Sequence, residues 1–200
     1  MVGMTSAATP KGTRRRSQLI EAAGTLLLEG GFDAVRHRAV ADRAGMPLAS
    51  TTYYFASLED LLAEAAAYVT HNEQEAIATR SAALTRRKRG GHATAEALSE
   101  VFVGSRTPIT ALAAHYELIA LAPRYPRLRQ VVEQRRGFVS SVHTEVLEKS
   151  GRDCGPDDVA RLIAVEDGAV VGALGCGAGS PYDATRDALD GVIDVLAPRR

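Results

Sequence analysis

"VRHRAVADRAGMPLASTTYYFASLEDLL", Val35 to Leu62, decides the fold of this 200-residue chain. It predicts two very short helices, about His37 to Ala44 and Leu48 to Tyr54, with Gly45-Met46-Pro47 between them. Glycine permits a left-handed turn, and proline sets the backbone dihedral at the start of the next helix. Serine, threonine and tyrosine are poor helix formers, so the second helix needs a reason other than propensity.

Two short helices joined by a tight turn are the smallest unit that presents a helix to the major groove of DNA. The first helix of such a pair crosses the DNA backbone, and the second reads base edges. Arg36, His37 and Arg38 stand at the start of the first helix, where phosphates would lie. The sequence therefore predicts a helix-turn-helix.

Helix signals continue on both sides of this unit, because apolar residues recur at three- and four-residue spacing and no segment alternates like a strand. An upstream helix is expected from about Thr13 to Glu29, ended by Gly30-Gly31. Ser57 caps a long downstream helix that extends into the 80s. Five more follow, at about 94–104, 107–121, 127–150, 155–175 and 180–196. The prediction is an all-α fold of about nine helices.

Charge is distributed unevenly, although the formal net charge is zero. Between Pro10 and Ser57, seven basic residues stand against four acidic ones. This asymmetry favours a polyanionic partner for the N-terminal region. A second basic stretch, Thr85 to His92, is either a solvated turn or a further nucleic-acid patch.

Several classes of protein are disfavoured. No apolar run approaches the roughly 20 residues that span a membrane, so no membrane partner is expected. The N-terminal residues lack the apolar segment of a secretory signal. Cys154 and Cys176 have no companions at metal-ligand spacing, which is typical of thiols in a reducing cytosol. We therefore expect a cytoplasmic protein with no metal site and no cofactor.

Catalytic residues are not predicted. The chain has no phosphate-binding loop, no zinc-protease motif and no nucleophile on a recognisable turn. The adjacent carboxylates Asp157-Asp158 and Glu166-Asp167 are better explained by the helix dipole and by surface charge than by acid–base chemistry. The main alternative to a DNA-binding regulator is a helical small-molecule carrier or sensor without a specific DNA target. A small all-α enzyme is the least favoured reading.

A resemblance to the TetR (tetracycline repressor-like) family of transcriptional regulators is carried by Arg14 to Leu62, "RRRSQLIEAAGTLLLEGGFDAVRHRAVADRAGMPLASTTYYFASLEDLL". The "EAA…L…GGFDA" helix, the "VADRAGM" helix and turn, and the aromatic pair before "F.S.EDLL" match in order and spacing. The resemblance implies a three-helix DNA-binding domain followed by a ligand-binding and dimerisation domain. We place a disordered basic arm at 1–12, the helix-turn-helix domain at 13–57 and the second domain at 58–200.

The resemblance further implies a homodimeric repressor that binds a palindromic operator in double-stranded DNA and is released by a small molecule. Arginines before the first helix would contact phosphates, which gives affinity without sequence information. Hydroxyl and methyl groups of the second short helix can meet base edges, while Phe55 belongs to the core. The predicted DNA-binding residues are Arg14, Arg15, Arg16, Arg36, His37, Arg38, Ser50, Thr51, Thr52, Tyr53 and Tyr54.

The second domain is expected to hold a mostly apolar pocket for an unidentified, largely apolar effector. Candidate contacts are polar or aromatic residues on its helices, of which the His115-Tyr116 pair and Glu166 lie within apolar stretches. The candidate ligand-binding residues are Tyr68, His71, Phe102, His115, Tyr116, Phe138, His143 and Glu166.

Three glycines, Gly168, Gly172 and Gly175, weaken the helix expected at 155–175 and so require a reason. Small residues on one face let another helix approach closely, either from the same chain or from a second copy. The resemblance favours a second copy. The predicted dimer interface comprises Gly168, Ala169, Val170, Gly172, Ala173, Leu189, Val192 and Ile193.

Overall fold

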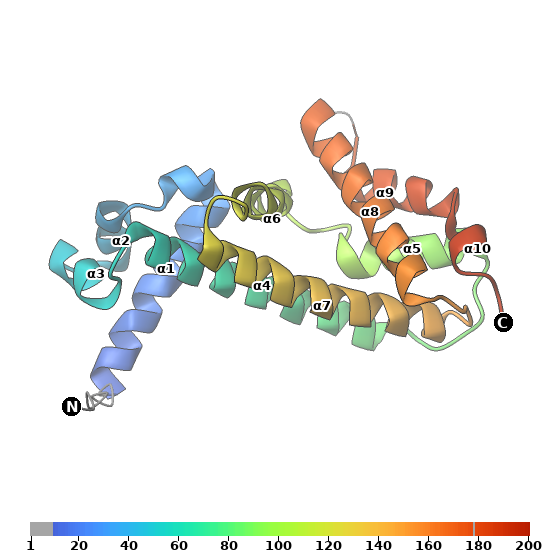
Figure 1. The fold of residues 1–200 in the computed structure, drawn as a ribbon, viewed down its shortest axis with the longest axis horizontal. Helices are drawn as coiled ribbons and strands as arrows, with labels where there is room; N and C mark the ends of the chain where they lie inside the picture. The colour runs from blue at the N-terminus through green and yellow to red at the C-terminus, as the bar shows by residue number, and fades with distance from the viewer. Residues whose placement is uncertain (1–9, 178) are drawn as a thin grey trace.

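The structure, a computed structural model, describes residues 10–177 and 179–200 and is all-α (Figure 1). Helices α1 to α3 form one end of the molecule, α4 and α7 run side by side along its length, and α5 and α8 to α10 form the other end. The helices are α1 (Pro10–Ala34), α2 (His37–Ala44), α3 (Leu48–Tyr54), α4 (Leu58–Ala83), α5 (Gly91–Phe102), α6 (Ile109–Leu121), α7 (Pro126–Lys149), α8 (Pro156–Cys176), α9 (Pro181–Asp190) and α10 (Ile193–Leu196).

The two short helices have the bounds predicted from the sequence. Gly45 ends α2 in the left-handed region (φ 64°, ψ 34°), and its N–H donates to carbonyl oxygens of the last turn. Ser57 caps α4, because its hydroxyl oxygen accepts the Asp60 N–H at 3.0 Å. Local turn and capping chemistry therefore sets these boundaries.

Helix α1 begins at Pro10, three residues before the expected Thr13. Its helical geometry breaks at Gly30 (φ −142°, ψ 19°) and Gly31 (φ 67°, ψ −170°), as the glycine pair predicted, and a short turn continues to Ala34. The Gly31 conformation is one that essentially only glycine adopts. Of the arm predicted at 1–12, residues 1–9 lie outside the described residues.

The C-terminal end differs from the prediction of one helix at 180–196. Helix α9 ends at Asp190, and α10 starts only at Ile193, so Gly191 and Val192 break the expected helix. Val192 has φ −125°, outside helical geometry. The described part of the chain thus contains ten helices, nine of them with at least seven residues, in agreement with the predicted all-α fold of about nine.

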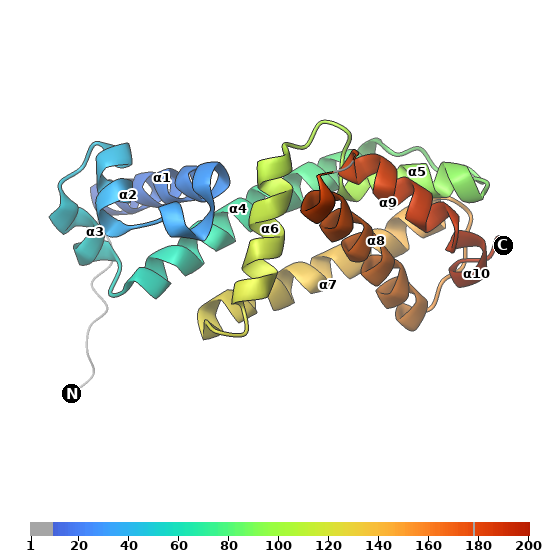
Figure 2. The same cartoon turned by 90° about the horizontal axis from the view of Figure 1, so that it is seen from above.

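Helix α6 contributes to the core of the N-terminal end and, through Leu112, to a small third cluster with Val103 and Val170. One hydrophobic cluster joins α1, α2 and α4 to Leu118 and Ala122 at the end of α6, and to Leu128 of α7. A second cluster joins α5, α7, α8, α9 and α10. Both views place α6 between the N-terminal helices and α8 (Figure 2). Helix α6 is therefore packed against the N-terminal helices as well as against its own domain.

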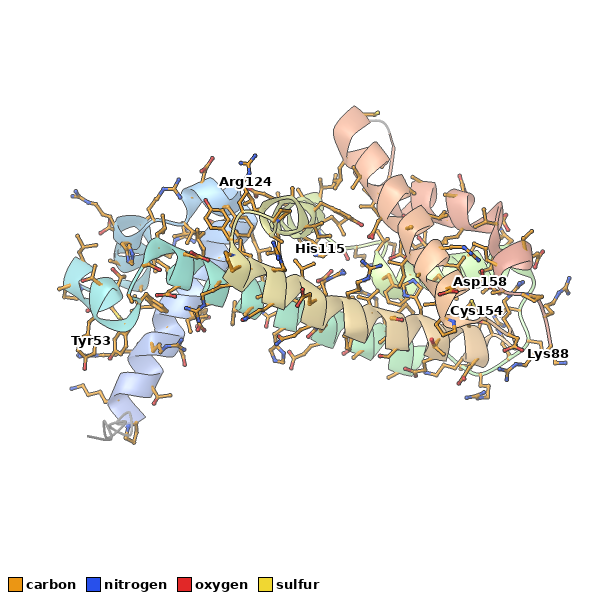
Figure 3. All side chains as sticks on the ribbon, in the orientation of Figure 1. Tyr53, Lys88, His115, Arg124, Cys154 and Asp158 are labelled. Atoms are coloured by element: carbon orange, nitrogen blue, oxygen red, sulfur yellow. The ribbon has the colours of Figure 1, made fainter. Side chains whose placement is uncertain are left out.

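The basic stretch Thr85 to His92 is partly internal. The Arg89 side chain is buried and donates hydrogen bonds to the carbonyl oxygens of Thr85 and Lys149. Lys88 lies at the opposite end of the molecule from Tyr53 (Figure 3). These positions favour a turn, in which Arg89 is buried, over a nucleic-acid patch. Every helix within the described residues is too short or too polar to cross a lipid bilayer.

Candidate DNA-binding face and ligand cavity

Helix α3 has one buried and one exposed side. Thr51 is fully buried, and its hydroxyl donates to the Leu48 carbonyl oxygen at 2.8 Å. On the other side the Tyr53 side chain is 81% exposed at the end of the molecule (Figure 3). Thr52 and Leu48 are exposed beside it. Packing of Thr51 and of buried Phe55 explains how a sequence of low helix propensity is held.

This orientation corrects part of the predicted DNA-binding set. Thr51 cannot reach a base edge, because its side chain is used inside the domain. Tyr54 packs against the core. Its ring lies edge-on to the Tyr53 ring, with the two ring centroids 4.9 Å apart. Sequence reasoning missed the exposed Leu48 and Ala49, since apolar residues carry no obvious binding signal. Their methyl groups can meet thymine methyls in a major groove.

The predicted phosphate contacts fall into two groups. Arg14, Arg15 and Arg38 are exposed. Two other arginines are engaged within the domain. Arg16 pairs with Glu64 at 2.7 Å and lies over the Phe55 ring, and Arg36 bonds to Asp33 and to neighbouring carbonyls. His37 is half-buried, and its Nδ1 has no hydrogen-bond partner in the described part of the chain.

A Tyr53→Ala substitution is expected to reduce discrimination between operator and random DNA by about 1–3 kcal/mol, because a side chain that reads bases contributes only on the correct sequence. The measurement is the affinity for each DNA at matched salt. Tyr54→Phe, which changes only a hydroxyl, is the control. An equal loss on both DNAs would make Tyr53 a phosphate contact.

A cavity of about 720 Å³ lies between α1, α4, α5 and α6. Its wall is mainly apolar and includes Leu27 and Leu28 from the end of α1. Two of the eight candidate ligand residues, Phe102 and His115, line it. The other residues that line it are Ala66, Val69, Thr70, Asn72, Glu73, Ala76, Arg80, Glu100, Gly104, Ser105, Arg106, Thr107, Pro108, Ala111, Leu112, Ala114 and Leu118.

His115 is the buried polar group on the α6 side of this cavity (Figure 3). Its Nε2 atom is buried without a hydrogen-bond partner among the described residues. Burial lowers the pKa of His115 to about 4, the nearby Arg135 charge lowers it as well, and Glu73 opposes them. The imidazole is therefore neutral at pH 7.

This burial predicts an acid-sensitive stability. The unfolded chain protonates His115 near its ordinary pKa of about 6.5, whereas the folded chain does so only near 4, so protonation favours unfolding. The free energy of unfolding is expected to fall by about 3 kcal/mol through this group between pH 6.5 and 4, and to be unaffected by it above that window.

The measurement is urea denaturation across this pH range for wild type and His115→Gln. The variant should lose this part of the pH dependence. His71→Gln is the matched control, because His71 is exposed on α4. If the free energies of unfolding of wild type and His115→Gln change in parallel down to pH 4, the His115 imidazole is not the titrating group.

Glu73 and Arg80, both on α4, are cavity residues that the sequence did not reveal. Arg135 donates to both carboxylate oxygens of Glu73, at 2.8 and 2.7 Å. Burial acts to raise the pKa of Glu73, but the Arg135 bonds and charge outweigh it, and the pKa is lowered. Both positions read as ordinary polar residues of an amphipathic helix, so no periodicity could identify them.

The remaining candidate ligand residues are engaged elsewhere. Tyr68 packs on Gly24 of α1, and Phe138 packs against the second core cluster. His71 is exposed and pairs with Glu75. The Tyr116 hydroxyl donates to Asp167 at 3.0 Å, and the buried pair His143–Glu166 (3.2 Å) stacks its imidazole on Phe102. A smaller cavity of about 230 Å³, between α6, α7 and α8, touches His115 from another side.

Half of the predicted dimer residues are used inside the protomer. Val170, Ala173, Leu189 and Ile193 are buried, so their side chains are unavailable to a partner. Some of the exposed residues of α8 recur at helical spacing on one face instead. They include Ala164, Gly168, Val171, Gly172 and Gly175. A Cβ added at any of these three glycines would meet nothing within the described chain, so packing within the protomer does not explain them.

A hydrogen-bonded contact links α6, which forms part of the cavity wall, to the turn before α2. Both carboxylate oxygens of Glu117, on α6, accept the Phe32 N–H at 3.2 Å. A Cβ on Gly31 would lie 2.6 Å from a Glu117 oxygen, so a side chain at position 31 would displace this carboxylate from its present position. Phe32 lies in the short turn that leads into α2. We refer to the contact between Glu117, Gly31 and Phe32 as the α6 latch.

The fold and these sites define a class of protein, in which a helix-turn-helix domain is joined to a helical domain with a ligand-sized cavity. The family described as "Bacterial regulatory proteins, tetR family" matches residues 19–65, and "Tetracyclin repressor-like, C-terminal domain" matches residues 89–195. The chain belongs to the TetR family of DNA-binding transcriptional regulators, which are not enzymes.

Solved structures include several similar proteins. The multidrug binding protein EbrR, solved in complex with proflavin, is 29% identical over 90% of this chain and 99% of its own, with a TM-score of 0.69. A TetR family member from Streptomyces coelicolor A3 is 29% identical over 89% and 97%, with a TM-score of 0.66. A TetR regulator from Haloarcula marismortui shares the fold. It is 18% identical over 92% of this chain and 99% of its own, with a TM-score of 0.72. No curated protein matches the chain.

Proposed function

We propose that this protein is a homodimeric repressor that binds a palindromic operator and is released when a largely apolar small molecule enters the cavity. It would act in the cytoplasm, where a bacterial operator is found. The observation that carries the proposal is the position of the cavity. Leu27 and Leu28 of α1 line it together with α6, so a ligand would touch the DNA-binding domain and its neighbouring helix at once.

The α6 latch supports a route from ligand to DNA. Ala114, His115 and Leu118 line the cavity, and Glu117 lies on the same turn of α6. A ligand that displaces α6 would therefore move the carboxylate that holds the turn before α2. Release is then a population shift, and DNA binding must weaken ligand binding by the same factor.

The exposed face of α8 supports the homodimer. Small residues at this spacing let two helices approach closely, and Val171, 48% exposed, adds apolar surface. The C-terminal half of α8 projects from the body of the molecule in Figure 1. Two-fold symmetry would place two copies of α3 on the two halves of a palindrome.

The cavity supports a small-molecule effector. Its volume falls in the range of about 300–1,000 Å³ that is typical of ligand pockets, and its wall is mainly apolar. The similar protein EbrR is named as a multidrug binding protein and was solved with proflavin and with ethidium.

The test is selection of bound fragments from the host genome at several salt concentrations. Enrichment of one palindromic site is expected. Absence of an enriched site would favour the alternative of a helical small-molecule carrier, which the cavity alone would also serve. Titration of candidate effectors into the operator complex would then show whether occupation of the cavity releases DNA.

A further inference from the structure

The charges around the larger cavity are not equally available to a ligand. Glu73 is the acidic residue on its α4 wall, and Arg135 donates to both of its carboxylate oxygens. Glu100 is exposed at the edge of the cavity, where its carboxylate accepts the Ser105 N–H at 3.3 Å. The charge of Glu73 is therefore neutralised by Arg135, whereas the Glu100 carboxylate lies at the rim with a backbone N–H as its hydrogen-bond donor.

Arg80 is different, because its guanidinium is held in place but incompletely bonded. Its Nε donates to the Val101 carbonyl oxygen at 2.9 Å, which is its one hydrogen bond among the described residues. Gly104 approaches the same group so closely that an added Cβ would lie 3.2 Å from Cζ and 3.3 Å from Nη1. The terminal amino groups Nη1 and Nη2 are left for another partner.

Burial lowers the pKa of Arg80, although the charges of Glu100 and Glu73 raise it. The guanidinium remains charged at neutral pH even so, because arginine starts from a very high value. A fixed, partly desolvated guanidinium whose two terminal amino groups are unbonded within the described part of the chain matches a carboxylate, which can accept one hydrogen bond from each of them.

We propose that the cavity takes an anionic amphiphile, a molecule with one carboxylate on Arg80 and an apolar body against the leucine and valine side chains of α1, α4 and α6. This inference rests on the proposed function for the identity of the site and specifies the chemical class of its ligand.

The test is calorimetric titration of the protein with three probes of equal chain length: decanoate, 1-decanol and decyltrimethylammonium. Decanoate is expected to bind most tightly. An Arg80→Met substitution, which keeps most of the apolar stem, should weaken decanoate binding by about ten-fold or more and leave decanol binding unchanged. Tighter binding of the ammonium probe by wild type would overturn the proposal, as would unchanged decanoate binding by Arg80→Met.

Arg129→Met is the matched control, because Arg129 is exposed on α7 and does not line the cavity. Glu100→Gln removes the carboxylate charge at the rim while it leaves the Arg80 side chain in place. It should tighten decanoate binding by about two-fold and weaken binding of the ammonium probe, since a rim carboxylate repels one and attracts the other. If Arg80→Met does not fold, an absence of both shifts in Glu100→Gln overturns the proposal.

Operator binding separates this proposal from the proposed function. Decanoate that binds through Arg80 without releasing the operator would uphold the ligand class and contradict the release mechanism. Release of the operator by other compounds, with no decanoate binding, would uphold the release mechanism and contradict the ligand class.

Discussion

A Gly172→Glu variant is expected to be a folded monomer that binds operator DNA about a hundred-fold more weakly than wild type. Gly172 is exposed, and an added Cβ meets nothing in the described chain, so the protomer itself accepts a side chain there. In the proposed dimer, the same side chain would separate two closely packed helices and bury charge. A monomer loses the second, linked contact with the palindrome, which accounts for the large effect.

Gly137→Glu is the matched control, because Gly137 is also an exposed helical glycine with open space around its Cα. It lies on α7, outside the proposed interface, and should leave both properties unchanged. Equilibrium sedimentation measures the oligomeric state, and fluorescence anisotropy measures operator affinity. A Gly172→Glu protein that remains dimeric would contradict the proposed interface.

A Gly31→Ala variant is expected to lose about 3 kcal/mol of unfolding free energy, from backbone strain and overpacking together. The backbone at φ 67°, ψ −170° is unsuited to a residue with a side chain. The added methyl group would also lie 2.6 Å from a carboxylate oxygen of Glu117. The measurement is urea unfolding at neutral pH.

Gly45→Ala is the comparison for a positive φ without crowding. Gly45 lies in the left-handed helical region (φ 64°, ψ 34°), which a side chain tolerates better than the Gly31 conformation, and a Cβ there meets nothing within 4 Å, so its loss should be only about 1 kcal/mol. Combining Gly31→Ala with Glu117→Ala should relieve the crowding part alone. Strictly additive losses would show that the α6 latch does not restrict the residue at position 31.

Some features could be predicted from the sequence because they depend on neighbouring residues. The bounds of α2 and α3 follow from Gly45 and Pro47, and the start of α4 follows from the Ser57 cap. The break between α9 and α10 could not be predicted in this way, because the residue outside helical geometry is Val192 (φ −125°), whereas Gly191 keeps helical dihedrals (φ −67°, ψ −19°). Residue type therefore located the helix-turn-helix more accurately than it located α9 and α10.

The side chains that α3 exposes could not be predicted in the same way. Thr51 and Tyr53 are two residues apart in a seven-residue helix of polar and aromatic residues, which has no clear apolar stripe. Packing against the rest of the domain buries Thr51 and leaves Tyr53 in solvent. The cavity was even less predictable from the sequence, because its wall combines residues from four helices between Leu27 and Leu118.

By itself, the sequence determined the all-α fold, the helix-turn-helix and the family, because these depend on spacing and turn chemistry within some fifty residues. Only the tertiary structure decided that Arg80 is open to the cavity while Glu73 is paired, that Glu117 reaches the turn before α2, and that the α8 glycines face outward. Each of these facts depends on which helices pack together across the fold. Residue type alone does not determine whether a side chain is paired or buried.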